Sequence, residues 1–406
     1  MTRLSRLSVG VIALVAFAAL GYVALAVLDE PTAAYERSLP PSDPDPISAE
    51  PLTTHPPTTA ASSSTSAALA PSTTTTANSI STYLVWISGG LPSVFVAGLA
   101  ETFDRVSIVK GDMVELDGAG DGGVIPLDAL ALHPAAHRPF DSDGHLEWLR
   151  PEAVILGETS AAIRGLAIGN QLTIADTNYE VAAIVPDEAV AYAEVVFDLS
   201  DHSLPIATDR YALVATDLAR DEFETAVQAL SDGRTPIQIR SEGDTSWLRH
   251  ADGVLPQVLI KQALGEFSYT NLAGSDFDQS STFRDERIIT SEVPVLGEVV
   301  CHETVTEMLT GAMTQLVDEG LTDLVDPGGF AGCWYPRFVR TASGSPAGVS
   351  RHAWGAAVDI NAPTNPYGSE GVQDTRLVEI MQAWGFGWGG DWLVPDPMHF
   401  EFRQQP

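Results

Sequence analysis

The chain of 406 residues contains 54 acidic and 21 basic residues, which gives a formal net charge of −33 at pH 7. Because nucleic acids present dense rows of phosphate groups, so acidic a chain is not expected to bind them. A length of 406 residues exceeds what one hydrophobic core usually covers, so the sequence predicts more than one domain.

The N-terminal stretch predicts a membrane anchor. Residues 7–28 contain no charged side chain and are long enough to cross a hydrocarbon layer of about 30 Å. Arg3 and Arg6 precede this run and acidic residues follow it. The positive-inside rule therefore places residues 1–6 in the cytoplasm and the C-terminal domains outside, as a single-pass cell-membrane protein. A cleaved signal peptide is the alternative, because Ala24-Leu-Ala26 resembles a small-residue cleavage site.

Residues 29–80 are rich in Pro, Ser, Thr and Ala and almost lack large apolar side chains. Such a segment cannot bury enough apolar surface to offset the conformational entropy that is lost on ordering. The sequence therefore predicts a disordered Pro/Ser/Thr linker that holds the folded part of the chain away from the membrane.

Residues 81–260 are predicted to form a β-rich extracytoplasmic domain. Short runs rich in Val, Ile, Tyr and Phe indicate strands. The expected strands are 83–87, 106–109, 153–156, 171–175, 179–185, 195–197 and 211–215, and a helix is expected at 222–230. The stretch from Leu156 to Pro186 resembles the extracytoplasmic β-rich module of bacterial export permeases. This resemblance implies a non-catalytic domain with a possible protein partner.

Three histidines of this domain invite a metal-site interpretation. His133, His137 and His145 lie close together in the sequence. Pro134 and Pro139 oppose a helix that would bring the three side chains to one face. We therefore expect solvent-exposed loop histidines here and no metal site.

Residues 264–406 are predicted to form a second domain, which contains the only two cysteines of the chain, Cys301 and Cys333. Outside the cytoplasm, an isolated pair of cysteines is most simply a disulfide. A pair of buried free thiols is the alternative. In the chain-entropy model, a bridge that closes a loop of this size stabilises the fold by roughly 3–4 kcal/mol.

Two stretches of the second domain have helical periodicity. The stretch 304–319 is followed by Gly320, which is placed to end a helix. Its apolar positions are 305, 308, 309, 312, 313 and 316. The stretch 375–384 has the same spacing, with Asp374 placed to cap its start and Gly385 to end it.

Two short runs near the C-terminus carry residues with metal-binding chemistry. One is Ser350-Arg-His-Ala-Trp-Gly-Ala-Ala-Val-Asp359 and the other is Asp396-Pro-Met-His-Phe-Glu401. The alternation of polar and aromatic residues in 399–402 predicts a strand that turns His399 and Glu401 to one face. The small apolar residues before Asp359 predict a buried strand, and a buried carboxylate needs a cation or hydrogen-bond donors beside it.

Each of these residues taken alone has a simpler interpretation. A single histidine in apolar surroundings is usually a hydrogen-bonded core residue, and a single aspartate often caps a turn. Together, however, His352, Asp359 and His399 form a set of two imidazoles and one carboxylate, which suits Zn²⁺ with one coordination position left for water. Asp396, held in an extended approach by its two flanking prolines, could reach such a water without being a ligand.

The spacing Ser-x-His-x-x-Gly-x-Ala-x-Asp, followed by Trp-Gly-Gly-Asp-Trp and Asp-x-x-His-Phe-Glu, closely resembles the VanY-type D-alanyl-D-alanine carboxypeptidase family of zinc peptidases. Relatives of that family include L-alanyl-D-glutamate peptidases of phage endolysins. The resemblance covers about residues 264–406. It implies that His352, Asp359 and His399 bind zinc and that Asp396 is the general base.

The resemblance also implies roles for other polar residues. Arg337 best matches the arginine that the family places upstream of the Ser-x-His motif to bind a substrate carboxylate, and Arg340 is the neighbouring candidate. Ordinary surface positions are the alternative for both. Ser350 could donate a hydrogen bond to the substrate or a zinc ligand, or could cap the turn. Glu401 competes with Asp396 for the catalytic role, but we favour Glu401 as the acceptor that orients a metal-bound imidazole.

The implied fold is α+β, with a small sheet and packed helices as in hedgehog and D,D-peptidase proteins, preceded by the β-rich domain and the transmembrane helix. The implied activity is hydrolysis of an amide bond in a peptidoglycan stem peptide, either D-Ala-D-Ala or L-Ala-D-Glu. A zinc-stabilised module that binds the cell wall or regulates a partner without catalysis is the alternative. The presence of Asp396 favours the enzyme, because a binding module has little use for a general base.

Overall fold

The computed structural model describes residues 80–405 except 119, 121, 202–204, 232, 234, 242–243, 245–254, 272–275 and 340–347. The expected cytoplasmic tail, the expected anchor and all of the expected linker except Ile80 therefore lie outside the described residues. Within the described ranges, no helix combines the length and the apolar composition that crossing a membrane requires.

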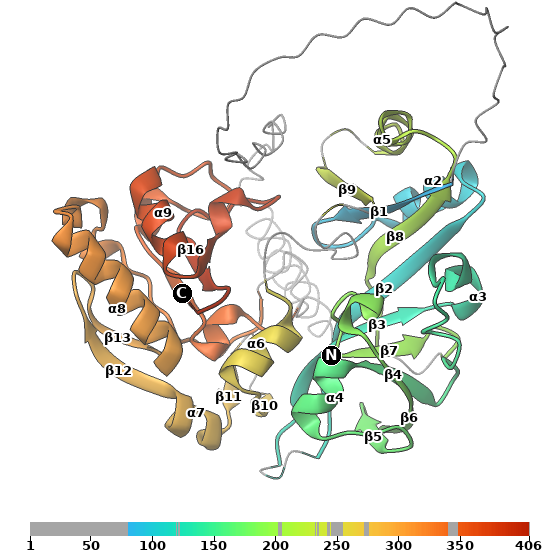
Figure 1. The fold of residues 1–406 in the computed structure, drawn as a ribbon, viewed down its shortest axis with the longest axis horizontal. Coiled ribbons are helices and arrows are strands. Elements are labelled where there is room, and N and C mark those ends of the chain that lie inside the picture. The colour runs from blue at the N-terminus through green and yellow to red at the C-terminus, as the bar shows by residue number, and fades with distance from the viewer. Residues whose placement is uncertain are drawn as a thin grey trace, which may run out of the picture. The chain divides into compact units, whose positions relative to one another are not determined.

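A nine-stranded sheet occupies the N-terminal half of the described chain (Figure 1). Its strand order is β3-β7-β4-β6-β5-β2-β8-β1-β9, and β2 also pairs with β3. Six strands therefore close into a ring, and β8, β1 and β9 extend it beyond β2. The strands are β1 (Ser81–Ile87), β2 (Val106–Leu116), β3 (Ile125–Leu132), β4 (Ala153–Gly157), β5 (Gln171–Ile174), β6 (Thr177–Val185), β7 (Val195–Asp198), β8 (Asp209–Thr216) and β9 (Ile237–Ser241).

The seven strands predicted from the sequence are all present, and β3 and β9 are additional. Side chains along much of β2 alternate between buried and half-buried, whereas every residue of β4 is buried, as in a strand that is covered on both faces. The helices of this region are α2 (Ser93–Thr102), α3 (Pro134–His137), η1 (Arg138–Phe140), α4 (Glu158–Arg164), η2 (Asp187–Val190) and α5 (Arg220–Gln228). Helix α5 confirms the helix expected near residue 222.

One expectation for this region is wrong. His137 is not an exposed loop residue: it ends α3, is 7% exposed, and its Nδ1 lies 2.9 Å from Oγ of Ser107. Pro134 at the first position of α3 starts the short helix that buries the ring. Burial lowers the pKa of His137 to about 4, so the imidazole is neutral at pH 7.

The remaining described chain contains several helices and three small sheets (Figure 1). Helix α6 spans the domain boundary that the sequence suggests near residue 260. The elements are α6 (Gln257–Leu264), β10 (Tyr269–Asn271), β11 (Phe277–Gln279), α7 (Ser281–Arg287), β12 (Ile288–Val293), β13 (Gly297–His302), α8 (Glu303–Asp318), η3 (Thr322–Leu324), η4 (Pro327–Gly329), η5 (Arg351–Trp354), β14 (Ala357–Asp359), η6 (Ala362–Thr364), α9 (Thr375–Ala383), β15 (Phe386–Trp388), η7 (Gly389–Asp391) and β16 (His399–Phe402).

Helices α8 and α9 lie where the periodicity predicts them, and the six apolar positions of α8 are buried. The side chain of Asp374 caps α9 by accepting a hydrogen bond from a backbone N–H of the first turn at 2.9 Å. Gly320 and Gly385 follow the two helices with positive φ, as expected for helix ends. A Cβ on Gly311 of α8 would lie 2.1 Å from the Trp384 ring, so glycine permits the close approach of Trp384 to α8.

A three-stranded antiparallel sheet, ordered β14-β16-β15, presents the two C-terminal motifs. Phe400 and Phe402 of the central strand are 0% and 3% exposed and belong to the same core as Trp354. The opposite face of that strand carries His399, which is paired in register with Asp359 of β14. The buried phenylalanines thus hold the strand that carries His399.

Candidate metal centre

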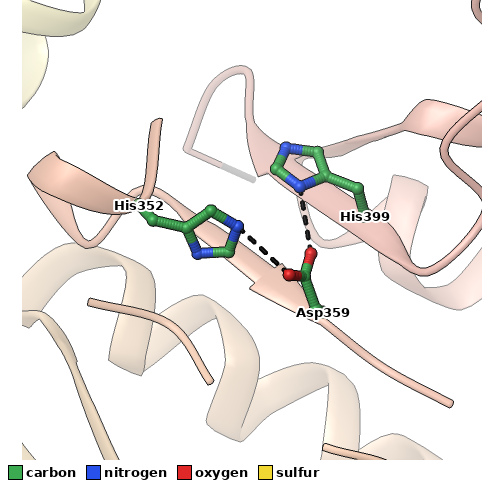
Figure 2. A group of neighbouring side chains, drawn as sticks. All are labelled: His352, Asp359 and His399. Atoms are coloured by element: carbon green, nitrogen blue, oxygen red, sulfur yellow. Dashed lines mark hydrogen bonds and ion pairs between the residues drawn. The ribbon is translucent and has the colours of Figure 1, made fainter. Parts of the chain in front are cut away.

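His352, Asp359 and His399 converge on one point (Figure 2). Oδ1 of Asp359 lies 3.0 Å from Nδ1 of His399, and Oδ2 lies 3.3 Å from Nε2 of His352. One ligand atom from each residue lies within 4.8 Å of the other two. Two imidazoles and a carboxylate at this separation could hold a metal ion.

Local backbone structure positions these three side chains. His352 lies on the 3-10 helix η5, Asp359 ends β14 and His399 begins β16. Directly opposed residues of an antiparallel pair share a face of the sheet, so the register turns Asp359 and His399 to the same side. Gly355 ends η5 with φ of +59°, and a Cβ there would lie 2.5 Å from the backbone nitrogen of His302. Glycine therefore lets the turn that carries His352 lie against β13.

Hydrogen bonds on the far side of each imidazole decide which nitrogen faces the centre. Nδ1 of His352 lies 2.7 Å from the carbonyl oxygen of Cys333 and must donate to it, because a carbonyl only accepts. Nε2 of His399 lies 3.4 Å from Oε2 of Glu401 and donates to that carboxylate. Nε2 of His352 and Nδ1 of His399 are therefore the atoms whose lone pairs can face a cation.

Nε2 of His352 is buried and has no hydrogen-bond partner. It lies within ion-pair distance of Asp359 Oδ2, at 3.3 Å, but the contact lacks hydrogen-bond geometry. A buried nitrogen lone pair beside a carboxylate oxygen is unfavourable unless a proton or a cation lies between them. The donor set thus fits a divalent transition metal such as zinc.

Charge coupling within the cluster shifts its pKa values. Burial alone would raise the pKa of Asp359, but the neighbouring imidazoles of His352 and His399 hold it well below its usual range. Burial alone would lower the pKa of His399, but hydrogen bonds to Asp359 and Glu401 raise it to about 10. Without a metal, His399 therefore carries a proton where a cation would bind, so metal and proton compete for this site.

Asp396 lies beside the cluster on the loop that leads into β16. Its Oδ1 atom is buried without a hydrogen-bond partner. Burial raises the pKa of Asp396, and the charges of His399, Asp359 and Arg337 also act on that pKa. The loop is fixed by hydrogen bonds from the backbone N–H of Asp396 to Gly389 at 2.8 Å and from that of His399 to Asp396 at 3.0 Å.

Arg337 and Ser350 lie next to each other near this loop. The backbone N–H of Ser350 donates to the carbonyl of Arg337 at 3.1 Å, and Ser350 is buried. The charge of Arg337 acts to lower the pKa of Asp396. Arg340, the other arginine singled out from the sequence, lies outside the described residues.

Glu401 is 2% exposed and lies behind His399. Its Oε2 atom is also 4.0 Å from Nε of Arg351. Burial alone would raise the pKa of Glu401, but the hydrogen bond from His399 and the charge of Arg351 lower it. Its contacts are those of a residue that orients an imidazole.

Cys301 and Cys333 form the predicted disulfide, with Cα atoms 5.3 Å apart. Two further contributors to the site are not predicted from the sequence: the carbonyl of Cys333 and the indole of Trp392. The Trp392 ring lies 5.2 Å from the His399 ring between centroids. The Trp-Gly-Gly-Asp-Trp run could have indicated the indole, whereas a backbone carbonyl leaves no signal in a sequence.

Three solved structures are only weakly similar to part of this chain, with TM-scores below 0.5. The periplasmic region of MacB from Actinobacillus actinomycetemcomitans is 9% identical, with 40% of this chain and 90% of that chain covered and a TM-score of 0.28. The extracellular domain of the noncanonic ABC-type transporter YknZ from Gram-positive bacteria is 11% identical, with 39% and 98% covered and a TM-score of 0.27. A permease protein domain from Porphyromonas gingivalis is 15% identical, with 40% and 88% covered and a TM-score of 0.25.

No curated protein matches the chain. Residues 343–402 match the family model described as D-alanyl-D-alanine carboxypeptidase. The matched segment contains His352, Asp359, Asp396 and His399. The match supports the peptidase family and does not single out the VanY type. The C-terminal segment of the chain is therefore similar in sequence to the D-alanyl-D-alanine carboxypeptidase family.

Proposed function

We propose that this chain is a zinc-dependent peptidase that hydrolyses an amide bond in a peptidoglycan stem peptide, as D-alanyl-D-alanine carboxypeptidases do. The observation that carries the proposal is the convergence of His352, Asp359 and His399 beside the buried, unpartnered carboxylate oxygen of Asp396. The family match over residues 343–402 supports the reaction class.

His352 through Nε2, Asp359 through its carboxylate and His399 through Nδ1 would hold the zinc ion. When bound, zinc polarises the scissile carbonyl and lowers the pKa of a water molecule. Cys333 and Glu401 keep the two imidazoles in the orientation that this role requires, because each accepts a hydrogen bond from the outer ring nitrogen.

Asp396 acts as the general base. Its carboxylate accepts a proton from the attacking water and returns that proton to the leaving amine. Burial supports this role because it raises the pKa of Asp396, which makes the ionised carboxylate a stronger proton acceptor than an exposed one.

Arg337 binds a carboxylate of the substrate. A guanidinium group can hold a carboxylate through two parallel hydrogen bonds, which fixes the position of the peptide end as well as its charge. The hydrogen bond from Ser350 N–H to the Arg337 carbonyl connects this arginine to the turn that carries His352.

We also propose where the chain acts. The uncharged run 7–28 anchors it in the cell membrane, with residues 1–6 in the cytoplasm and the linker 29–80 reaching toward the peptidoglycan. The β-rich region 81–260 contacts a partner protein. The length of the apolar run and the flanking charges support the anchor.

The full chain, purified in detergent, should be incubated with muropeptides that carry a pentapeptide stem, and the products identified by mass spectrometry. We expect release of D-alanine that a chelator abolishes and added zinc restores. His399→Gln should abolish release, whereas His133→Gln, a change at an exposed histidine, should preserve it. Cleavage between L-Ala and D-Glu would support the peptidase activity but would show that a different peptide bond is the substrate. Activity that survives in metal-free protein would overturn the proposal.

A further inference from the structure

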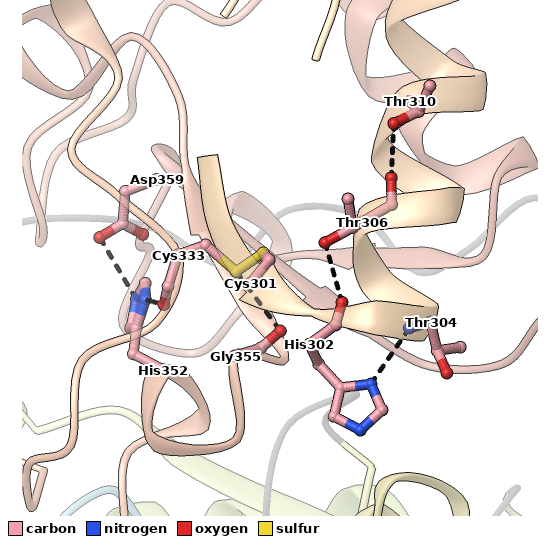
Figure 3. Close-up of a disulfide and its surroundings, with 9 residues drawn as sticks. All are labelled: Cys301, His302, Thr304, Thr306, Thr310, Cys333, His352, Gly355 and Asp359. Carbon is pink, nitrogen blue, oxygen red and sulfur yellow. Dashed lines mark hydrogen bonds and ion pairs between the residues drawn. A yellow bond between two sulfur atoms is a disulfide. The ribbon is translucent and has the colours of Figure 1, made fainter. Parts of the chain in front are cut away.

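We propose that the disulfide between Cys301 and Cys333 positions the metal ligands, in addition to stabilising the fold. The bridge holds a segment, Gly332–Tyr335, whose backbone is hydrogen-bonded to both His352 and Asp359. Figure 3 shows the disulfide and the hydrogen bond between the His352 ring and the Cys333 carbonyl. This inference rests on the proposed function, because it assumes that these side chains bind a metal.

The first contacts join the segment to His352. The carbonyl oxygen of Cys333 accepts the hydrogen bond from Nδ1 of His352 at 2.7 Å, and the backbone N–H of Tyr335 donates to the carbonyl of His352 at 2.9 Å. The side chain and the main chain of this residue are thus both held by the segment. Because the Cys333 carbonyl fixes the tautomer, its position decides whether Nε2 presents a lone pair to a cation.

The second contacts join the same segment to Asp359. Gly332 and Asp359 form an isolated antiparallel bridge in which the Asp359 N–H donates to the Gly332 carbonyl at 3.2 Å. The N–H of Ala331, the residue just before the segment, donates to the carbonyl of Asp359 at 2.9 Å. A displacement of Cys333 would therefore disturb two of the three ligands together.

The bridge attaches this segment to a buried strand. Cys301 is 0% exposed on β13, where the neighbouring Val300 carbonyl accepts a hydrogen bond from the Trp334 N–H at 3.0 Å. The N–H of His302 donates to the carbonyl of Gly355 at 3.2 Å, in the turn just after His352. Strand β13 thus contacts the turn and, through the sulfur atoms, the segment that orients it.

The Cys301 side of the bridge, where β13 meets α8, is also held by hydrogen bonds. Nδ1 of His302 accepts the Thr304 N–H at the start of α8 at 3.2 Å, so its Nε2 carries the proton and donates to the carbonyl of Leu264 at 3.0 Å. The hydroxyl of Thr306 donates to the carbonyl of His302 at 3.0 Å. The segment Gly332–Tyr335, in contrast, has neither helix nor strand of its own, and the disulfide and the hydrogen bond from Trp334 to Val300 attach it to β13.

The test is zinc affinity in the full chain that carries Cys301→Ala and Cys333→Ala together. Alanine leaves no thiol that could bind zinc and places no hydroxyl in the core. Outer contacts to metal-bound histidines typically contribute 10-fold to 100-fold in metal affinity, so we expect zinc to bind about 10-fold to 100-fold more weakly. Competition with a chromophoric chelator, well below the melting temperature, measures this change.

Leu316→Ala is the matched control. Leu316 is 0% exposed on α8 of the same core, but its side chain does not belong to the segment or the ligands. This variant should also melt at a lower temperature yet keep the zinc affinity of the native chain. The visible spectrum of bound Co²⁺ should change in the double alanine variant and not in Leu316→Ala, because that spectrum reports ligand geometry.

Unchanged zinc affinity and an unchanged Co²⁺ spectrum in the double variant would show that the disulfide only stabilises the fold. If the native chain itself binds no zinc, the proposed function fails and the inference fails with it. If the double variant does not fold, a ¹⁵N–¹H correlation spectrum of histidines in the zinc-loaded native chain remains decisive. The inference requires a proton on Nδ1 of His352, assigned with His352→Gln, and a proton on Nε2 would overturn it.

Discussion

Asp396 and Glu401 are two acidic residues near the same imidazole, and their surroundings give them opposite properties. Burial raises the pKa of Asp396, one of whose oxygens has no hydrogen-bond partner. The hydrogen bond from His399 and the charge of Arg351 overcome burial and lower the pKa of Glu401. Each residue has one buried oxygen without a hydrogen-bond partner, so the two differ in their pKa shifts and in the hydrogen bond that Glu401 accepts from His399. A carboxylate with a raised pKa suits proton transfer, whereas a low-pKa carboxylate that is hydrogen-bonded to an imidazole suits orientation.

Asp396→Asn should abolish most hydrolysis without loss of zinc, because it removes the base and leaves every ligand in place. General acid and base groups typically contribute 10²-fold to 10⁴-fold to rate, so kcat should fall by about that factor. Kinetics on muropeptides and metal analysis of the same preparation measure both quantities. A near-native kcat in this variant would show that another residue is the general base.

Glu401→Gln should show the converse pattern. A neutral amide is a weaker acceptor for the Nε2 proton of His399, so zinc affinity should fall by about 10-fold to 100-fold. Activity should recover when zinc is supplied in excess, and a chelator competition experiment measures the affinity. Unchanged zinc affinity together with a lasting loss of kcat would instead identify Glu401 as the base.

The sequence could predict the three candidate ligands because their chemistry lies in their side chains. His352, Asp359 and His399 lie in two motifs that can be recognised in the printed sequence, and the two motifs together indicate one metal site. The contribution of Cys333 could not be predicted, since it comes from a backbone carbonyl whose direction depends on the fold. The sequence predicts the wrong surroundings for His137, because flanking prolines usually indicate a loop, whereas Pro134 here begins a helix.

At the level of elements, the hydrophobic periodicity of the sequence predicts which face of a helix is buried, and the packing of α8 confirms it. Helix α8 buries all six apolar positions that the 3.6-residue period selects. The sequence does not predict strand β3, because its residues, Ile-Pro-Leu-Asp-Ala-Leu-Ala-Leu, include several that favour helices. Its strand conformation comes from pairing with β2 on one side and β7 on the other, which local propensity does not record.

Leu309→Ala should destabilise the fold through the core beneath α8. Leu309 is 0% exposed, and truncating a buried leucine typically costs about 2–5 kcal/mol because a cavity remains. Val317→Ala on the same helix, at a position that is 46% exposed, should cost less than about 0.5 kcal/mol. Urea unfolding of both variants provides the comparison, and equal losses would contradict the assigned core face of α8.

Across the whole molecule, one buried cluster of charges connects the large sheet region to helix α6. The Lys261 Nζ atom of α6 lies 2.8 Å from Oε2 of Glu194 and 3.1 Å from Oε2 of Glu266. Arg164 of α4 pairs with both carboxylates. The side chains of Lys261 and Glu194 are 0% exposed, so each compensates the charge of the other where water cannot.

The ionised state of Glu194 should stabilise the folded chain against acid. Burial alone would raise the pKa of Glu194, but the charges of Lys261 and Arg164 lower it to about 2, from an ordinary value of 4.5. A carboxyl group whose pKa is lowered on folding contributes stability above pH 4.5 that is lost as pH falls from 4.5 toward 2. We expect the free energy of unfolding to decrease across this range.

Glu194→Gln tests this expectation. Removing one partner of a buried ion pair costs up to roughly 3–5 kcal/mol at pH 7, and the acid-dependent loss should shrink in this variant. Glu180→Gln, at an exposed pair with Arg150, should cost about 0–1 kcal/mol. Urea unfolding at pH 7 and pH 3.5 compares the three proteins. An acid-dependent loss as large in Glu194→Gln as in the native chain would contradict the account.

The most direct measurement is an anomalous difference map at the zinc edge, from a crystal of the full chain grown with zinc. The proposed function predicts one strong peak bonded to Nε2 of His352, the carboxylate of Asp359 and Nδ1 of His399. The fourth position should hold a water molecule that is hydrogen-bonded to Asp396. A map without a peak at these three residues, or with a fourth protein ligand in the place of water, would contradict a zinc peptidase.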